Sequence, residues 1–597
     1  MSRFQEFYQS TYPTDSRGNP FVDNDWGYYT QNLPQAPKDI ENRYAHLVGG
    51  GIGNLIAAAY LIRDGHMPGK NITLYEAKPV SGGSLDGAGN NEEGFIARGG
   101  REMGQHFESF FDIMKDVPAI EMPEPHSVVD EFRKTNEMDP NYNPCRLISD
   151  HGTKRLRNPE MGLNKKAQLQ IVKLLFANEK DIQYKTISDW FSDDFLQSNF
   201  YLMWKSMFAF QDYNSLIEMK RYMHRFMQYM PGFPDMSCLR FSKYNQYTSF
   251  VEPLEKFLEG KGVNFVFDTF VEDLELEQNI NSIVVTSLEC QTPEGHKSIP
   301  VQENDVVIVT NGSITSRTVF GDNTTVPDFA KAKQDRPWQL WHNLARKSAK
   351  FGRPEVFAKD PDQSTWESIS FNFYGGEENP FIAKLHEMTG NDPLSGCTVT
   401  GGIITATDSP WLCSLTVNRQ PQFPGQEEGL CVAWAYGLNV HERGSVVHKP
   451  MVECTGEEIL KEFCYHYDLI DQFEEVKKRT KVRLAVMPYI TSQFNPRGEG
   501  DRPWPVPEGS KNLGFTGQYV ETPDDCVFTV EGSCRTSQMA VYKLLDLDRD
   551  VRPTWPSQYD VRTMLAAAKA MNDGKLPGEK FLKRLLGNTY YEDLLPR

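Results

Sequence analysis

The sequence predicts an α/β protein built around a Rossmann-type βαβ unit, and three observations near its start predict this. A short apolar run at 44–48 is typical of a buried strand, and it meets a glycine turn at 49–51. Helix-forming residues follow over 54–63. A second β-rich run at 71–75 completes the unit.

Composition sets wider limits on the molecule. The 597 residues are enough for several domains, and 39% hydrophobic with 12% aromatic residues excludes a disordered chain. A formal charge of −18 disfavours nucleic acid, which demands clustered positive charge. The sequence has no apolar run of about 18 residues and no secretory leader, and its ten cysteines are scattered like reduced thiols. We therefore expect a cytoplasmic protein, and the cysteine and histidine spacing predicts no metal site.

The remaining chain changes character several times. Residues 160–260 are helical in pattern, and 263–309 alternate as strands do. The stretch 398–440 is β-rich, and 511–545 gives a strand and then a helix. We expect an N-terminal arm (1–42), a discontinuous nucleotide-binding domain (43–150, 263–330, 500–550), a helical region (151–262), a β-rich substrate-binding region (331–499) and a C-terminal helical segment (551–597).

The glycine turn has the pattern Gly49-x-Gly51-x-x-Asn54. The first glycine permits a tight turn, and the second lets the backbone approach a pyrophosphate at the helix N-terminus. Asn54 replaces the third glycine of this motif, which is expected to loosen the packing of helix on strand. Glu76, at the end of the second strand, can accept hydrogen bonds from ribose hydroxyls and would repel a 2′-phosphate.

The residues after Glu76 indicate which dinucleotide is bound. Gly83 and Ser84 belong to a Gly-Gly segment that resembles the FAD-binding flavoproteins of the glutathione-reductase kind. The strands at 263–289 and 306–312 resemble later FAD-contacting elements of that fold, and Gln518 stands where its terminal motif has aspartate. The chain has no second dinucleotide turn for a nicotinamide. The cofactor residues that this resemblance implies are Gly49, Gly51, Asn54, Glu76, Gly83, Ser84, Arg101, Glu102, Val271, Thr310 and Ser533.

Residues 98–102 place two arginines around a glycine pair, followed by Glu102. The glycines would let the backbone lie against a flat ring while Glu102 points toward it. Composition alone is equally compatible with an ordinary arginine–glutamate pair on a surface turn.

Ten longer stretches resemble the oleate hydratase family, also called myosin-cross-reactive antigens, and extend the likeness over about 44–565. They are LIRDGHMPG (61–69), GGSLDG (82–87), RGGREM (98–103), MFAFQDYNSLIEMKRYMHRF (207–226), KYNQY (243–247), VTNGSIT (309–315), TGGIITATDS (400–409), NRQPQF (418–423), MPYITSQF (487–494) and GDRPWPVP (500–507).

The resemblance implies an FAD-containing hydratase that adds water to the cis-9 double bond of unsaturated fatty acids, without net redox change. Oleate would give 10-hydroxystearate, and linoleate is a further expected substrate. Glu102 and Tyr222 match the catalytic residues of the family. Gln246, Thr416 and Asn418 match the residues that hold the fatty carboxylate. Gln422 stands where many members have histidine, so a contact that could be charged becomes neutral.

Other readings stay open from the residues alone. A flavin-dependent double-bond isomerase or desaturase would share the fold, and so would a non-catalytic FAD-containing lipid-binding protein. Tyr222 alone would suit a helix face beside a methionine stripe. In the segment 571–597, Phe581, Leu582, Leu585 and Leu586 can share one helix face beside basic residues. That helix would dock on the core, pair in a homodimer or contact a membrane surface peripherally.

Overall fold

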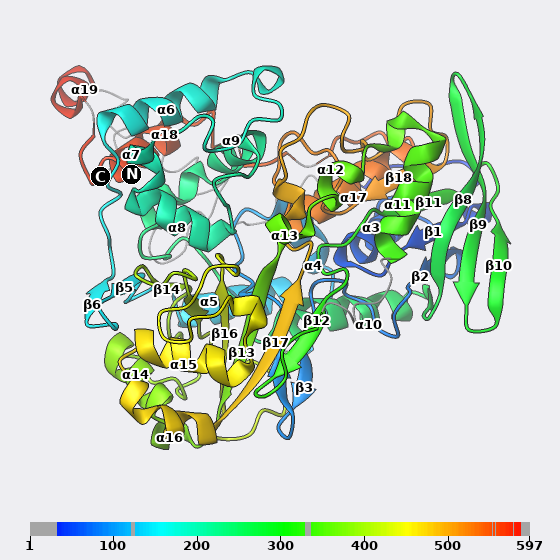
Figure 1. Cartoon of the computed structure of the whole chain (residues 1–597). Coiled ribbons are helices and arrows are strands. Elements are labelled where there is room, and N and C mark those ends of the chain that lie inside the picture. The colour runs from blue at the N-terminus through cyan, green and yellow to red at the C-terminus, as the bar shows by residue number, and fades with distance from the viewer. Residues whose placement is uncertain are drawn as a thin grey trace.

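The computed structural model describes residues 33–120, 126–328, 336–551, 553–555, 557–576 and 578–586. Most of the expected N-terminal arm (1–42) and residues 587–597 of the C-terminal segment therefore lie outside the described residues. Two sheets dominate the molecule, a parallel one and a larger mixed one, and a group of helices lies beside them (Figure 1).

The expected βαβ unit forms the centre of a five-stranded parallel sheet. The central strands β1 (Ala45–Val48) and β11 (Val306–Thr310) are buried almost throughout, which is why both are mainly apolar in sequence. The helices α3 (Ile52–Arg63) and α17 (Val530–Leu544) pack together against it. The strand order is β18 (Leu513–Thr516), β11 (Val306–Thr310), β1 (Ala45–Val48), β2 (Ile72–Tyr75) and β7 (Asn264–Val266).

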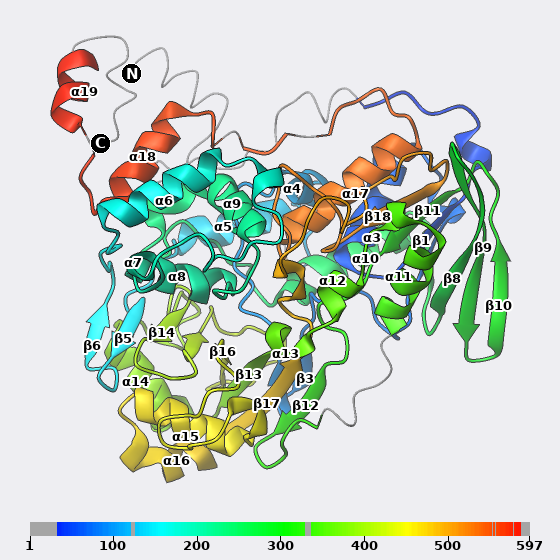
Figure 2. The same ribbon diagram turned by 45° about the horizontal axis from the view of Figure 1, so that its top comes forward.

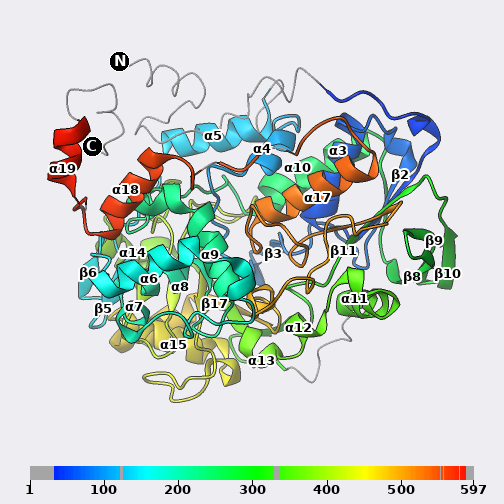
Figure 3. The ribbon, with the colours of Figure 1, turned by 90° about the horizontal axis from the view of Figure 1, so that it is seen from above.

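A separate three-stranded antiparallel meander lies beside this sheet, as the alternating sequence predicts. It consists of β8 (Phe270–Asn279), β9 (Ser282–Thr292) and β10 (Gly295–Pro300). The helix α11 (Arg336–Lys347) packs on β8. Seen from above, the meander lies at the end of the molecule opposite α19 (Glu579–Leu586) (Figure 3). Mixed α/β architecture is confirmed, with Rossmann topology in the parallel sheet.

The second sheet has eight strands, and its buried side chains belong to the same hydrophobic cluster as those on one face of the parallel sheet. Its central strands β13 and β16 are buried along their whole length. Two of its strands, β5 (Leu147–Ser149) and β12 (Val319–Asp322), come from ranges that we expected in the nucleotide-binding domain. The domain boundaries at 150 and 330 stay predictions. The order is β12 (Val319–Asp322), β17 (Thr480–Met487), β13 (Trp366–Phe373), β16 (Cys431–Gly437), β15 (Ser414–Thr416), β14 (Ile404–Ala406), β5 (Leu147–Ser149) and β6 (Lys154–Leu156).

Helices flank both sheets and close the molecule. The expected methionine stripe is confirmed, because Met219, Met223 and Met227 are all buried at and just beyond α9. The helix α18 (Val561–Met571) lies beside α6, and α19 extends beyond it (Figure 2). Among the described residues, no helix is both long and apolar enough to cross a membrane. The other α-helices are α4 (Glu108–Met114), α5 (Val128–Met138), α6 (Lys165–Phe176), α7 (Asp193–Leu196), α8 (Asn199–Phe208), α9 (Leu216–Arg225), α10 (Glu252–Gly260), α12 (Glu355–Ala358), α13 (Pro361–Ser364), α14 (Pro380–Thr389), α15 (Gly456–His466) and α16 (Phe473–Lys478), with a small hairpin of β3 (Ala88–Asn90) and β4 (Gly94–Ile96).

Asn54 ties the parallel sheet together, which corrects the expectation that it loosens the packing. The residue is fully buried in the first turn of α3. Its Nδ2 donates to the carbonyl of Val48 at 2.8 Å and of Gly49 at 2.9 Å, and it lies 3.2 Å from Thr310 Oγ1. The side chain thus bridges the ends of β1 and β11, a task that a glycine cannot perform.

Restoring the glycine of the motif should therefore destabilise the protein. Asn54→Gly leaves buried carbonyls unpaired, which costs about 1–3 kcal/mol, and adds about 1 kcal/mol of glycine penalty within a helix. Urea unfolding measures the loss. Asn54→Ala separates the two effects, since it removes the hydrogen bonds only. A glycine variant as stable as the parent would contradict the bridging role.

Candidate functional site

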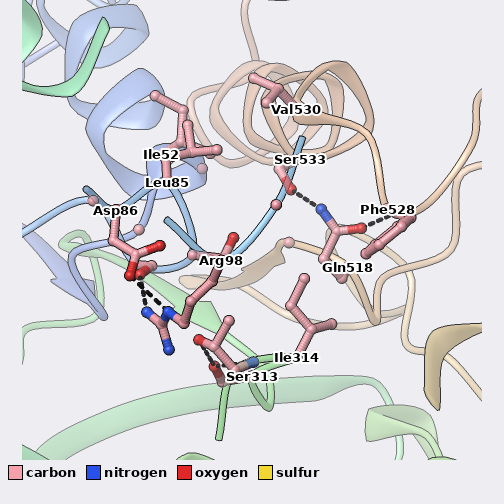
Figure 4. Close-up of a pocket in the computed structure, with 18 of the residues that line it drawn as sticks. Ile52, Leu85, Asp86, Arg98, Ser313, Ile314, Gln518, Phe528, Val530 and Ser533 are labelled. Carbon is pink, nitrogen blue, oxygen red and sulfur yellow. Dashed lines mark hydrogen bonds and ion pairs between the residues drawn. The ribbon is translucent and has the colours of Figure 1, made fainter. Parts of the chain in front are cut away.

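One cavity of about 590 Å³ joins the parallel sheet to the eight-stranded sheet. At one end lies the glycine turn between β1 and α3, and at the other lie aromatic side chains of β13 and β16. Figure 4 shows part of its wall, with labelled residues from α3, from the loops after β2, β4, β11 and β18, and from α17. The predicted residues that line it are Gly49, Gly51, Glu76, Gly83, Ser84, Arg101, Glu102, Tyr222, Gln246, Val271, Thr310 and Ser533.

The glycine turn is shaped for close approach. Gly49 has a φ of 95°, and no side chain caps the N-terminus of α3 at Gly51, so first-turn N–H groups stay available there. A Cβ on Gly83 would lie 3.0 Å from Gly51 Cα, so bulk is excluded on that side. Glu76 accepts from the N–H of Gly50 at 2.6 Å, and burial raises its pKa. Of the predicted cofactor residues, Asn54 alone does not line the cavity.

Gln518 has a structural task at the position where the flavoprotein motif has aspartate. Its Nε2 donates to Ser533 Oγ at 2.9 Å, and its Oε1 accepts from the N–H of Phe528 (Figure 4). The side chain therefore ties the loop before α17 to the first turn of that helix. Across the cavity, Arg98 Nε donates to Asp86 Oδ2 at 2.6 Å and fixes the segment after the Gly-Gly pair (Figure 4).

The arginine–glycine turn places Glu102 against an aromatic wall. Arg101 has a φ of 64°, and its guanidinium donates to the carbonyl of Ser84. A Cβ on Gly100 would lie 2.7 Å from Trp434 Cζ3, so only glycine lets the turn pack on that ring. Glu102 Oε1 is buried without a hydrogen-bond partner among the described residues. Burial raises the pKa of Glu102 to about 7, against the opposing effects of its own backbone N–H, Arg146 and Arg101.

Tyr222 reaches the same cavity from α9. Its side chain is 1% exposed, and its hydroxyl donates to the carbonyl of Val527 at 2.6 Å. Burial raises its pKa well above the ordinary value, so the phenol keeps its proton at neutral pH. Four phenylalanine rings enclose it, those of Phe208, Phe210, Phe226 and Phe494.

The four residues expected at a carboxylate site divide into two groups. Gln246 lines the cavity and donates to the carbonyl of Arg101 at 3.2 Å. Thr416, Asn418 and Gln422 are not part of its lining. Even so, Gln246 Oε1, Thr416 Oγ1 and Asn418 Oδ1 are all buried without a hydrogen-bond partner in the part of the chain that is described. Buried polar atoms are usually paired, so unpaired ones suggest contact with a ligand or with water.

Comparison with known proteins settles the family. The family model of the MCRA family matches residues 42–542. The chain belongs to the MCRA family. This MCRA protein is 39% identical to the oleate hydratase of Streptococcus pyogenes serotype M49 (strain NZ131), over 95% of this chain and 99% of that protein. It is 29% identical to the linoleate hydratase of Lactiplantibacillus plantarum, over 89% of this chain and 98% of that protein.

The likeness to solved structures is more distant. The cyclohexylamine oxidase of Brevibacterium oxydans IH-35A matches 84% of the MCRA chain with a TM-score of 0.48 and 12% identity, and covers 99% of its own length. So distant a likeness says nothing about the substrate.

The sequence alone did not identify the aromatic side chains of β13 and β16 that line the cavity of this MCRA protein. Trp434 and Tyr436 stand two residues apart on β16, and Trp366 lies beside them on β13. Their alternation in the run CVAWAYG shows that they share a face, but only the pairing of β13 with β16 shows what that face meets. Arg146 was also missed, because a lone arginine before a short strand carries no pattern.

Thr416 should tolerate loss of its hydroxyl in the ligand-free MCRA protein. Thr416→Val removes an oxygen that has no partner, so the free energy of unfolding should stay equal or rise by up to about 1 kcal/mol. Thr405→Val is the matched control, since Thr405 is equally buried but contacts Arg146 and Ser414. It should lose about 1–3 kcal/mol in the same urea titration. Equal losses in both variants would give Thr416 a structural role.

Proposed function

We propose that this protein is a fatty-acid hydratase that adds water to the cis-9 double bond of oleate, giving 10-hydroxystearate, with linoleate as a further substrate. One observation carries the proposal. A carboxyl group whose pKa is about 7 and a phenol that keeps its proton line the same largely apolar cavity. The named activities of two relatives that match almost over their full lengths support the same reaction.

The two groups suit the two halves of hydration. The Tyr222 O–H bond breaks as a C–H bond forms at C9, and cation character develops at C10. Water then bonds to C10 through its oxygen and passes a proton to the Glu102 carboxylate. Glu102 gains one proton while Tyr222 loses one, and the alkene gains only H and OH, so there is no net oxidation or reduction. The negative carboxylate also stabilises the developing cation, which helps a phenol that is by itself a weak acid.

FAD is the cofactor that fits the glycine-rich end of the cavity. The turn at Gly49 and Gly51 with the uncapped start of α3 would hold the pyrophosphate, and Glu76 would receive ribose hydroxyls. Gly83 and Ser84 leave room for the chain to pass beside the phosphates. When bound, FAD supplies a flat wall that shapes the site and orients Glu102. The fatty carboxylate would accept hydrogen bonds from the Thr416 hydroxyl, which has no partner within the described residues, and from the side-chain amide N–H groups of Gln246 and Asn418, beside the neutral Gln422.

Product mass tests the reaction. FAD-loaded protein given oleate in heavy-oxygen water should yield a product heavier by one labelled water, and mass spectrometry should find the label in the hydroxyl at C10. An unchanged mass would favour a double-bond isomerase, and loss of hydrogen a desaturase. Tight binding of oleate without turnover would indicate a non-catalytic lipid-binding protein.

Two variants test the roles in the same assay. Glu102→Gln and Tyr222→Phe should each lower the hydration rate by at least about 100-fold, the usual contribution of a general acid or base. FAD occupancy, read from absorbance, and the unfolding midpoint serve as controls. Parental rates in both folded, FAD-loaded variants would overturn the assignment.

We further propose that the protein is cytoplasmic and that its C-terminal segment attaches it peripherally to membranes. Phe581 on α19 is 67% exposed, and Lys580, Lys583 and Arg584 are exposed beside it. The preceding residues are anchored, because Asn572 accepts from Gln168 on α6 at 3.0 Å. The Phe581 side chain is thus exposed to solvent on a helix that follows a contact with α6. The same face would also suit a second copy of the chain.

Removing residues 577–597 should distinguish membrane binding from pairing of two chains, and it leaves the contacts of Asn572 intact. Co-sedimentation with anionic phosphatidylglycerol vesicles should fall several-fold, and hydration of dispersed oleate should stay at the parental rate. Phe581→Ser in the full chain gives the point control. Undiminished vesicle binding would remove the membrane proposal, and a shift from dimer to monomer on a sizing column would point to pairing instead.

A further inference from the structure

Arg146 is a fully buried guanidinium held by neutral groups, directly before β5. Its Nη1 donates to the carbonyl of Ile403 at 3.2 Å and to Thr405 Oγ1 at 3.1 Å. Its Nη2 donates to the carbonyl of Met203 and to Ser206 Oγ, each at 2.9 Å. These contacts fix the group between α8 and the eight-stranded sheet.

No carboxylate in the described part of the chain lies within ion-pair distance of Arg146, and its Nε is buried without a partner there. Other buried arginines of this protein are paired, as Arg225 is with Asp525 at 2.9 Å and Arg497 with Glu218 at 2.8 Å. A buried cation without an anion is strongly unfavourable. We therefore expect a negative charge close to Arg146, beyond direct contact, that stabilises the buried guanidinium.

The cavity wall supplies that charge. Ser206 and Ile403, which Arg146 contacts, line the cavity together with Glu102. The carboxylate of Glu102 has a buried oxygen without a partner, so it too lacks a direct counter-ion. The two charges act on each other: Arg146 lowers the pKa of Glu102, and Glu102 raises that of Arg146, in both cases against the larger effect of burial.

The other polar groups around Glu102 are committed elsewhere. Arg101 donates to the carbonyl of Ser84 and lies 3.4 Å from Asp86. Tyr436 is neutral, since burial raises its pKa, and its hydroxyl donates to the carbonyl of Ser206. The backbone N–H of Glu102 itself also favours the charged carboxylate. Arg146 thus stands as the one cation near Glu102, within the described chain, that no carboxylate neutralises.

We propose that Arg146 is the buried counter-charge of Glu102, a positioning residue that keeps this carboxylate ionised and ready to accept a proton from water. The inference rests on the proposed role of Glu102 as a base. Arg146 does not itself line the cavity, so its charge acts on the site through Glu102. Its four hydrogen bonds keep the charge at a constant distance, and burial keeps water from screening it.

The pH profile of hydration by the FAD-loaded protein tests this. Activity needs the Glu102 carboxylate, so the rate should fall as the pH drops through about 7, the raised pKa of that group. Without the Arg146 charge, the carboxylate becomes harder to ionise. Arg146→Gln should move the acid limb up by about one pH unit, which makes the rate about fivefold lower at pH 7 and leaves the alkaline plateau in place.

Arg146→Lys is the matched control, because it keeps the charge and loses the same hydrogen-bond geometry. Its acid limb should stay at the parental pH, whatever its stability. An infrared titration of the protonated Glu102 carboxyl band, assigned by its absence in Glu102→Gln, reads the same shift without turnover. If neither the acid limb of the pH profile nor the titration of the infrared band shifts in Arg146→Gln, the proposal is overturned, and Arg146 has only a structural role. Parental activity in Glu102→Gln would instead overturn the proposed function.

Discussion

The burial of one carboxylate, that of Glu102, constrains much of the architecture around the cavity. A carboxylate removed from water prefers its neutral form, and the raised pKa of Glu102 records that cost. The turn that carries it needs glycine at position 100 to approach Trp434, and a left-handed Arg101 to turn the chain. Arg101 and Arg146 then offset part of the cost from two sides. Separate elements combine to form this setting, because the turn follows β4 of the small hairpin while the aromatic wall belongs to β13 and β16 of the eight-stranded sheet.

The parallel sheet provides the fixed frame for that site. Asn54 joins β1 to β11, and Gln518 joins the loop after β18 to α17, so the strand ends that line the cavity are cross-linked by side chains. Both residues replace members of the usual dinucleotide motif. Each departure from the motif thus adds hydrogen bonds beneath or beside the cavity without adding bulk to the turn itself, where Gly49 and Gly51 are retained.

The βαβ unit could be predicted from the sequence because its signals are local: apolar strands, a glycine turn and an acid, all within about 30 residues. The eight-stranded sheet could not, since it pairs the three-residue strands β5 and β14, whose partners Leu147 and Thr405 are 258 residues apart in the chain. Glu102 and Tyr222 came from a family resemblance, and the cavity that unites them is a property of tertiary packing. The expected carboxylate residues were only partly located, because Gln246 lines the cavity while Thr416, Asn418 and Gln422 are not part of its lining.

Burial raises the pKa of both reacting groups, with opposite consequences. For Glu102 it brings the pKa close to neutral pH, where a carboxylate is a stronger base yet still partly ionised. For Tyr222, burial keeps the phenol protonated but makes it a weaker acid. Proton transfer from Tyr222 to an alkene must therefore depend on the negative charge of Glu102. A cation that develops between them is stabilised by the Glu102 carboxylate only while that group is ionised. The ionisation state of Glu102 therefore governs both proton transfer from Tyr222 and proton removal from water. A residue that keeps Glu102 ionised, as we propose for Arg146, affects both steps.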